Sequence, residues 1–199
     1  MAIKLEKLVL ATRNQHKLQE LKVYLQPYSI EVVLPDASMP DVKETGESFE
    51  DNALLKAYSI AKATGLPALA DDSGLCVWGI GGRPGVYSAR WAGPKQDYEH
   101  AFKKIESELA HNGSHMDRRA SFICSLALCF PEGQDPLTFE GRIDGTIINP
   151  PRGPMKFGYD PIFVPEGYKQ TFAEMPAAEK QKISHRTQAL KHFIAAVHG

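Results

Sequence analysis

The chain has 199 residues, of which 43% are hydrophobic and 24% are charged, a composition typical of a folded globular protein rather than a disordered one. Its 23 Lys and Arg residues nearly balance its 24 Asp and Glu residues, so net charge favours neither a nucleic-acid polymer nor an anionic membrane. No stretch has the length of a membrane span, and the three cysteines lack the spacing of zinc ligands. We therefore expect a single domain over residues 1–199, located in the cytoplasm, whose partner is a small molecule.

The first part of the chain predicts strands and helices in alternation. Lys7–Thr12 is an apolar run of strand length, and leucines at helical spacing predict a helix over residues 18–25. Ile30–Leu34 follows as a second short strand, and the acidic, proline-rich residues 35–47 indicate a loop.

The next helix carries both a start signal and a stop signal. Ser48 and Asp51 have the spacing of a capping box, and Gly65 suits the C-cap position. Pro67–Ala70 then predicts another short strand, which runs directly into Asp71.

The second half of the chain is richer in strands. A glycine-rich loop at residues 79–85 precedes an apolar stripe that predicts a helix ending near Gly113. Arg119–Phe130 suits a central strand, and Leu137–Ile148 is expected to pair with it. The last predicted elements are a strand and an amphipathic helix, Tyr159–Val164 and Ile183–Val197. Early alternation followed by clustered strands predicts an α/β fold with a long mixed β-sheet flanked by helices.

The turn between the first strand and the first helix is a candidate anion site. Such a turn presents backbone N–H groups and the positive end of a helix to an anion, although it lacks the glycine-rich pattern of a Walker loop. The alternative is an ordinary polar turn. Its residues are Thr12, Arg13, Asn14, Gln15, His16 and Lys17.

Acidic residues form a second candidate site. Adjacent carboxylates directly after an apolar strand are costly unless they are solvated, paired or bound to a metal ion. Because side chains alternate along a strand, we expect Asp71 and Asp72 to point in different directions and to have different roles. Magnesium prefers one or two carboxylates with water and phosphate oxygens, so Asp72 and Glu44 would suffice. The alternatives are a turn whose aspartates bond their own backbone and a solvated acidic loop.

Two groups nearer the C-terminus suit a nucleotide. An aromatic residue beside a glycine lets a flat base stack, and a carboxylate can read ring N–H groups; the alternative places the aromatics in the core. The residues are Phe157, Gly158, Tyr159 and Asp160.

The second group is cationic and consists of Lys180, His185 and Arg186. A shared ligand is easier if Ser184 caps a new helix; otherwise this is a solvated basic helix face.

The order of these motifs resembles that of a known family. The segments LATRNQHKLQEL, ETGESFEDNALLKA, LADDSGL, GGRPGVYSAR, FGYDPIF and EKQKISHRTQAL, which span Leu10 to Leu190, resemble the inosine triphosphate pyrophosphatases, the house-cleaning dITP/XTP pyrophosphatases. The resemblance implies an α/β fold with two lobes, a nucleotide cleft between them and a homodimer. It also implies magnesium-dependent hydrolysis of ITP, dITP and XTP to the monophosphate and pyrophosphate.

The resemblance further implies individual roles. Asp72 matches the general base and metal ligand, Ser73 matches a substrate contact, and residues 12–17 match the segment that wraps the phosphates and sugar. The base- and phosphate-binding positions are matched by Phe157, Gly158, Tyr159, Asp160, Lys180, His185 and Arg186.

The chain departs from the family pattern at two places. The family's first loop usually reads Thr-Gly-Asn with a later glycine, whereas this chain has Arg13 and His16, and losing glycine restricts the backbone. Arg13 either adds charge to the phosphates or points to solvent. The acidic pair often found before Thr-Gly is here Lys43-Glu44, so the metal role falls to Glu44.

These residues together predict a mechanism. Magnesium is held by Glu44 and Asp72, and Asp72 positions or deprotonates water for attack on the α-phosphorus. The phosphates are clamped by Lys17, Lys180 and Arg186. One rival is a Maf-like pyrophosphatase acting on modified pyrimidine nucleotides, against which the FGYD and SHR segments argue. The other rivals are a regulator that binds a nucleotide without cleaving it and a purely structural protein.

Overall fold

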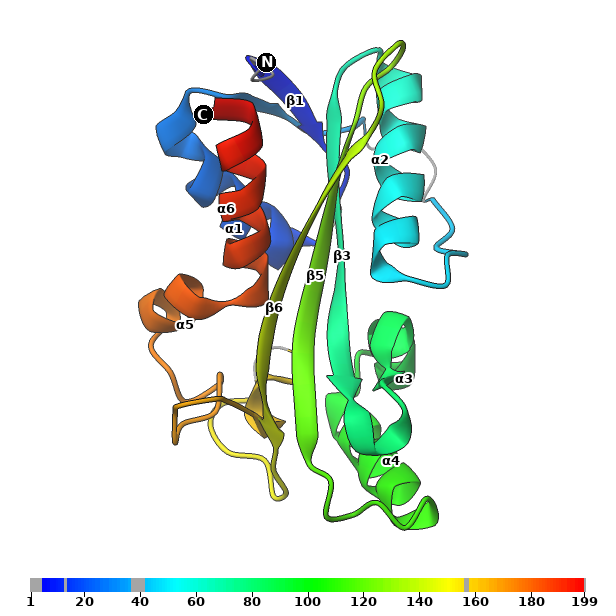
Figure 1. Ribbon diagram of the computed structural model, residues 1–199, viewed down its shortest axis with the longest axis vertical. Helices are drawn as coiled ribbons and strands as arrows, with labels where there is room; N and C mark the ends of the chain where they lie inside the picture. The colour runs from blue at the N-terminus through cyan, green and yellow to red at the C-terminus, as the bar shows by residue number, and fades with distance from the viewer. Residues whose placement is uncertain (1–4, 13, 37–41, 156–157, 199) are drawn as a thin grey trace. The chain divides into compact units, whose positions relative to one another are not determined.

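The computed structural model describes residues 5–12, 14–36, 42–155 and 158–198. Its sheet has seven strands in the order β2-β1-β3-β5-β6-β7, and β4 pairs with β3 outside this path. The strands are β1 Lys7–Leu10, β2 Glu31–Val33, β3 Ala68–Val77, β4 Arg83–Pro84, β5 Arg119–Cys129, β6 Leu137–Ile147 and β7 Phe163–Pro165. The helices are α1 Gln15–Leu25, α2 Phe49–Thr64, α3 Ser88–Ala92, α4 Tyr98–His111, α5 Ala177–Ile183 and α6 His185–His198 (Figure 1).

The sheet is mixed, as the sequence predicts. β1 pairs in parallel with both β2 and β3, whereas β4 runs antiparallel to β3 and β7 antiparallel to β6. Register places Val9 opposite Val33 on one side and opposite Ala68 on the other. None of the helices in the described part of the chain has the length and apolar character of a membrane span.

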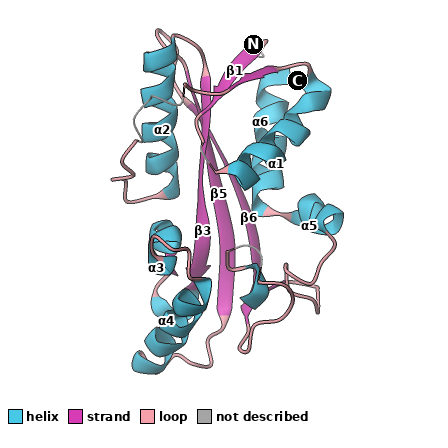
Figure 2. Cartoon of the chain, turned by 180° about the vertical axis from the view of Figure 1, so that it is seen from behind, coloured by secondary structure: helices cyan, strands magenta, loops and turns pink. Residues whose placement is uncertain are grey.

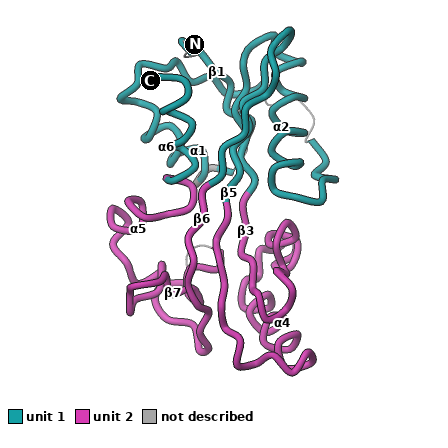
Figure 3. The backbone as a smooth tube through the Cα atoms, in the orientation of Figure 1, with its two compact units in different colours: residues 1–72, 124–140, 188–199 teal, residues 73–123, 141–187 magenta. Residues whose placement is uncertain are grey.

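The chain divides into two compact units (Figure 3). Unit 1 comprises Met1–Asp72, Cys124–Glu140 and Gln188–Gly199, and unit 2 comprises Ser73–Ile123 and Gly141–Thr187. Each unit is assembled from separate stretches of sequence, and β3, β5, β6 and α6 each contribute residues to both. The single domain expected over residues 1–199 stays a prediction.

Unit 1 has a core on each side of its strands. Alternate residues of β5 point to opposite sides: Leu128 packs in the cluster that contains α1 and α6, and Cys129 packs in the cluster that contains α2. Figures 1 and 2 show α1 and α6 on one side of these strands and α2 on the other. Both faces of the sheet in unit 1 are therefore buried.

Local signals explain where α2 begins and ends. The Ser48 side chain accepts a hydrogen bond from the Asp51 N–H at 3.0 Å, and the Asp51 carboxylate accepts one from the Ser48 N–H at 3.1 Å. Gly65 ends the helix with a φ of 67°, and its N–H donates to the Ala61 carbonyl. The predicted capping box and C-cap are both confirmed.

Two predicted elements in the middle of the chain differ from the structure. The strand expected at Pro67–Ala70 continues as β3 to Val77, because Leu75 and Val77 are buried in the core of unit 2. Asp71 and Asp72 thus lie inside a strand rather than after it. The glycine-rich segment expected as a loop at residues 79–85 contains a short helical turn and β4.

The C-terminal region also needs correction. The strand expected at Tyr159–Val164 begins only at Phe163, because Asp160–Ile162 forms a 3-10 turn. Its central Pro161 has no N–H to donate to a strand ladder. The helix expected over Ile183–Val197 is α6, which begins at His185, whereas Ile183 ends α5 and the break between the two helices falls at Ser184. The Ser184 side chain accepts a hydrogen bond from the Thr187 N–H at 3.2 Å, so the predicted option that Ser184 caps a new helix is confirmed.

Candidate active site

The two neighbouring aspartates of β3 face different helices. Asp71 is buried, and its Oδ2 lies 2.8 Å from Lys17 Nζ on α1. Asp72 accepts a hydrogen bond from Asn52 Nδ2 on α2 at 3.1 Å. Because α1 and α2 cover opposite sides of the strands in unit 1, the predicted difference in direction is confirmed, and each carboxylate has its own partners.

A lysine on α2 joins Asp72 to the acidic loop. Lys56 Nζ lies 2.6 Å from Glu44 Oε1 and 3.6 Å from Asp72 Oδ1. Two carboxylates from separate segments therefore converge on one cation. The sequence interpretation missed Lys56, although it follows Asn52 by one helical turn and flanks the buried alanine stripe of α2.

At both Asp72 and Lys56, burial and the nearby opposite charges shift the pKa in opposite directions. Burial raises the pKa of Asp72, Glu44 raises it further, and Lys56 and Lys17 oppose the increase. Burial lowers the pKa of Lys56, but attraction to Asp71, Asp72 and Glu44 outweighs this effect and raises it. Lys56 therefore stays charged at neutral pH, while Asp72 is a stronger base than an ordinary aspartate.

A close backbone approach holds the acidic loop against α2. The Gly46 N–H donates to Asn52 Oδ1 at 2.8 Å. A Cβ at Gly46 would lie 2.5 Å from Asp51 Cβ and 2.8 Å from Asn52 Oδ1, so a larger residue does not fit without a shift. Asn52 is fully buried and bonds both Gly46 and Asp72, which ties the Glu44 loop to β3.

The segment before α1 is organised by its own side chains. The Asn14 N–H donates to Thr12 Oγ1 at 3.3 Å, and Asn14 Oδ1 accepts the Lys17 N–H at 3.2 Å. Asn14 thus caps the start of α1. Of the remaining residues predicted here, Arg13 and the side chains of Gln15 and His16 lie outside the described part of the structure.

In unit 2, the predicted C-terminal cations are buried at the start of α6. Arg186 Nη2 donates a hydrogen bond to Ser73 Oγ at 3.1 Å, and Ser73 directly follows Asp72 in β3. The His185 ring stacks on Phe122 with centroids 4.9 Å apart and planes 10° apart. Both residues are less than a tenth exposed, so the alternative of a solvated basic face is wrong for them.

In the last predicted group, residues 157–160, one residue lies in the core and another forms an ion pair. Tyr159 is buried, and its hydroxyl donates to the Ser88 carbonyl at 2.8 Å. For Tyr159, the alternative of a place in the core is therefore confirmed. Asp160 pairs with Lys180, which belongs to α5. At Gly158, no atom of the described residues other than its chain neighbours lies within 4 Å of where a Cβ would be. Phe157, the predicted stacking residue, lies outside the described residues.

Known proteins match this chain over nearly its full length. The model of the Ham1 family matches residues 8–196. The chain belongs to the Ham1 family. It is 47% identical over 191 residues to the dITP/XTP pyrophosphatase of Zymomonas mobilis, covering 96% of this chain and 91% of that protein. It is 45% identical to the dITP/XTP pyrophosphatase of Bacillus licheniformis, covering 96% and 97%.

Solved structures of Ham1 proteins share the fold. A HAM1 protein from Coxiella burnetii aligns with a TM-score of 0.89 at 40% identity, covering 96% of this chain and 98% of that one. The Ham1 protein of Staphylococcus aureus aligns with a TM-score of 0.84 at 37% identity, covering 95% and 96%. The α/β fold with a mixed sheet is confirmed, and the nucleotide cleft between two lobes stays a prediction.

The part of the Ham1 chain that the structure describes offers few protein ligands for a metal ion. Among the described residues, no group of three or more His, Cys, Asp and Glu side chains is arranged around one point. Glu44 and Asp72 nevertheless reach the same ammonium group, so both can reach one cation. Two hard carboxylate ligands with the remainder supplied by water and phosphate oxygens suit Mg²⁺.

Proposed function

We propose that this Ham1 protein hydrolyses aberrant purine nucleoside triphosphates, namely dITP, XTP and ITP, to the nucleoside monophosphate and pyrophosphate. The observation that carries the proposal is the pair of carboxylates, Glu44 and Asp72, gathered around the ammonium group of the partly buried Lys56. This arrangement occurs in a chain that is 47% identical to one relative named dITP/XTP pyrophosphatase and 43% identical to another. Because house-cleaning enzymes act on the free nucleotide pool, we propose that the protein acts in the cytoplasm. We also propose that it is a homodimer, as the family resemblance implies.

Magnesium is the proposed cofactor. Glu44 and Asp72 are the residues that would hold it, and when bound it would neutralise charge on the phosphate oxygens. Lys56 lies between the same two carboxylates, so it holds the acidic loop beside β3 without a metal ion.

The chain's own residues then account for the hydrolysis. Asp72, whose pKa is raised by burial, accepts a proton from water as the water oxygen attacks the α-phosphorus. The bond from that phosphorus to the bridging oxygen breaks, and pyrophosphate leaves. Lys17 stabilises negative charge on the phosphates and is itself held by Asp71. The substrate roles that the resemblance gives to Ser73, Lys180, His185 and Arg186 stay predictions.

The proposal is tested by measuring pyrophosphate release from dITP, XTP and ITP against ATP and GTP, with and without Mg²⁺. We expect release only with the metal and a strong preference for the first three substrates. Equal rates on all five would remove the purine-cleansing role.

Asp72→Asn tests the assignment of the base. Loss of a general base typically costs about 10²–10⁴-fold in turnover, and the variant should keep its fold and its nucleotide binding. Asp135→Asn, an exposed aspartate in the β5–β6 turn, is the matched control. A fully active Asp72→Asn enzyme would show that another group activates the water.

A further inference from the structure

A fully buried asparagine interrupts the apolar side of α2. Asn52 is 0% exposed and shares the buried side of the helix with Ala53 and Ala57. Asparagine is a weaker helix former than alanine, and a buried amide costs free energy unless both of its halves are hydrogen-bonded. Helix formation and core packing alone would therefore favour an apolar residue at this position. The reason for the amide lies in the groups that it bonds.

Each half of the Asn52 amide bonds a different segment of the candidate site. Its Nδ2 donates to Asp72 Oδ2 on β3 at 3.1 Å, and its Oδ1 accepts the Gly46 N–H of the acidic loop at 2.8 Å. An ionised carboxylate only accepts and a backbone N–H only donates, so the two partners determine which way the amide points. Asn52 therefore connects the two segments that carry the predicted metal ligands.

The bond to Asp72 fixes how its carboxylate faces the shared cation. Asn52 holds Oδ2, whereas the oxygen that lies 3.6 Å from Lys56 Nζ is Oδ1. The side chain of Asp72 is only 10% exposed, so water offers it few alternative partners. Turning the carboxylate plane away from this orientation would break the bond to Asn52. The amide thus keeps Oδ1 directed at the position of the cation.

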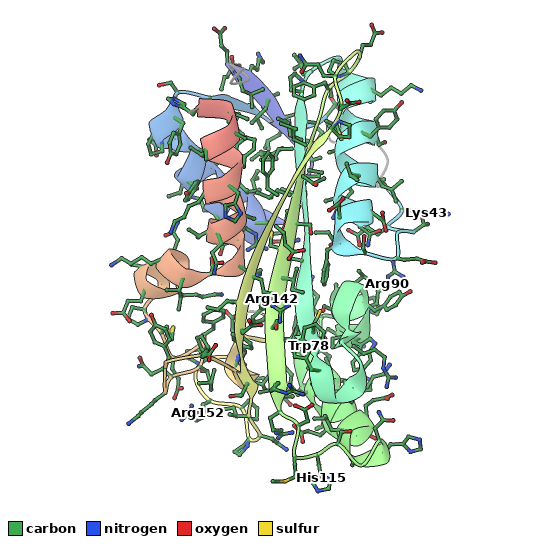
Figure 4. The ribbon with its side chains drawn as sticks, in the orientation of Figure 1. Lys43, Trp78, Arg90, His115, Arg142 and Arg152 are labelled. Atoms are coloured by element: carbon green, nitrogen blue, oxygen red, sulfur yellow. The ribbon has the colours of Figure 1, made fainter. Side chains whose placement is uncertain are left out.

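The bond to Gly46 fixes the backbone beside the second carboxylate. Gly46 follows Glu44 by two residues, and a Cβ on it would lie 2.9 Å from the backbone nitrogen of Asn52, so the loop packs directly on the helix. Lys43 lies on this loop and points away from α2 (Figure 4), whereas the next residue, Glu44, reaches Lys56 on α2 at 2.6 Å. Because Asn52 and Lys56 are one helical turn apart, the same face of α2 holds the loop at two points.

The two points of attachment respond differently to a metal ion. Lys56 attracts Glu44 and Asp72 through its charge, so a cation bound by both carboxylates takes over that role. Asn52 is neutral and uses Oδ2 of Asp72 and a backbone N–H, so its bonds are compatible with a bound cation. Groups that hydrogen-bond a metal ligand in this way typically contribute about 10–100-fold to metal affinity or activity.

We propose that Asn52 is a positioning residue, which aligns Asp72 and Glu44 for one divalent cation by bonding the carboxylate of the first and the loop of the second. Asn52 acts only through these two residues. The inference rests on the proposed function and adds to it a residue that determines how well the metal is held. The alternative is an amide that stabilises the fold and nothing else.

Asn52→Ala tests the proposal, because it removes both hydrogen bonds and keeps a good helix former. The probe is α,β-methylene dITP, in which carbon replaces the bridging oxygen and prevents cleavage. Isothermal titration with and without Mg²⁺ gives the factor by which the metal tightens binding. We expect this Mg²⁺ factor to fall by about tenfold or more in the variant, while the metal-free Kd stays near the wild-type value. With dITP and Mg²⁺ both saturating, kcat should also fall by about tenfold or more.

Two further variants separate positioning from folding. Thr64, at the other end of α2, also donates one hydrogen bond and accepts one through its side chain. Thr64→Ala should therefore lower the Tm but change neither the Mg²⁺ factor nor kcat. Gly46→Ala displaces the loop and leaves the Asn52 side chain in place, so it should reduce the Mg²⁺ factor by itself. It also decides the question if Asn52→Ala loses its far-UV circular dichroism.

Three results would overturn the proposal. They are a wild-type affinity for the analogue that does not depend on Mg²⁺, a folded Asn52→Ala or Gly46→Ala variant with the wild-type Mg²⁺ factor, and a variant whose affinities with and without metal fall equally. The last result is what a purely structural role would give. Failure of the proposed function is seen separately, as a wild-type chain that releases no pyrophosphate from dITP.

Discussion

At the scale of single residues, Lys56 offsets the repulsion between two neighbouring carboxylates. Its ammonium lies between Glu44 and Asp72, and it is the nearest cation to both among the ion pairs described. In Lys56→Met the two negative charges lose this shared partner. Because the group is partly exposed, we expect the free energy of unfolding to fall by about 1–3 kcal/mol in the absence of metal.

Added Mg²⁺ should return part of the lost stability, since a bound cation restores what the lysine supplied. Thermal unfolding followed by circular dichroism, with and without MgCl₂, measures both effects. Lys62→Met removes an exposed lysine from the same helix and should change neither melting temperature. An unchanged Tm for Lys56→Met would mean that the carboxylates do not depend on this cation.

Tyr159 links a buried hydroxyl to stability at alkaline pH. Burial raises the pKa of Tyr159, and the neighbouring Tyr98 raises it further. The unfolded chain ionises its tyrosines near pH 10, whereas the folded chain keeps Tyr159 neutral. Its contribution is therefore complete below that pH and is lost as the pH rises toward the folded pKa.

Tyr159→Phe isolates this contribution. Near neutral pH the variant should be about 1 kcal/mol less stable, because the Ser88 carbonyl loses its 2.8 Å donor. Above pH 10 the difference from wild type should shrink, since only the wild type bears the cost of a raised Tyr159 pKa. Urea unfolding at a series of pH values measures the difference directly. A gap that widened with pH would contradict the assignment.

At the scale of elements, α2 positions the residues of the candidate site. Its N-terminal capping box, made by Ser48 and Asp51, lies within one turn of Asn52 and two turns of Lys56. Ser48→Ala should destabilise the protein by about 1 kcal/mol through loss of the cap. Ser59→Ala, an exposed position in the middle of the same helix, should have little effect or a slight stabilising one. Equal melting temperatures of the two variants would show that the cap contributes nothing measurable.

The elements show which parts of the fold local sequence determines. α2 was predicted with both ends because capping residues act on the backbone beside them. β3 was predicted too short because it continues past Asp72 only by burying Leu75 and Val77 in unit 2, a tertiary effect.

The candidate site, too, can be predicted only in part from the sequence. Asp72 and Glu44 were found from charge and from the family resemblance, but their common partner Lys56 was not. A lysine within a helical pattern is normally solvated, and only the packing of α2 against β3 brings Lys56 to the buried Asp72. The break between α5 and α6 was correctly considered because Ser184 is a favoured capping residue.

At the scale of the whole molecule, two cores share continuous elements. β3, β5, β6 and α6 each pass from unit 1 to unit 2 without a break in their secondary structure. Losing the packing around such a strand in one unit removes support from its continuation in the other. We therefore expect one cooperative unfolding transition rather than two.

The positions of the tryptophans make this expectation testable. The chain has two tryptophans, and both Trp78 and Trp91 lie in unit 2, so tryptophan fluorescence reports on that unit alone. Phe193 is fully buried in unit 1, and Phe193→Ala should cost about 3–5 kcal/mol. If the units unfold together, the fluorescence-detected midpoint in urea shifts by as much as the midpoint seen by circular dichroism. A fluorescence transition that kept its wild-type midpoint while circular dichroism shifted would show that unit 2 unfolds independently, despite the strands it shares with unit 1.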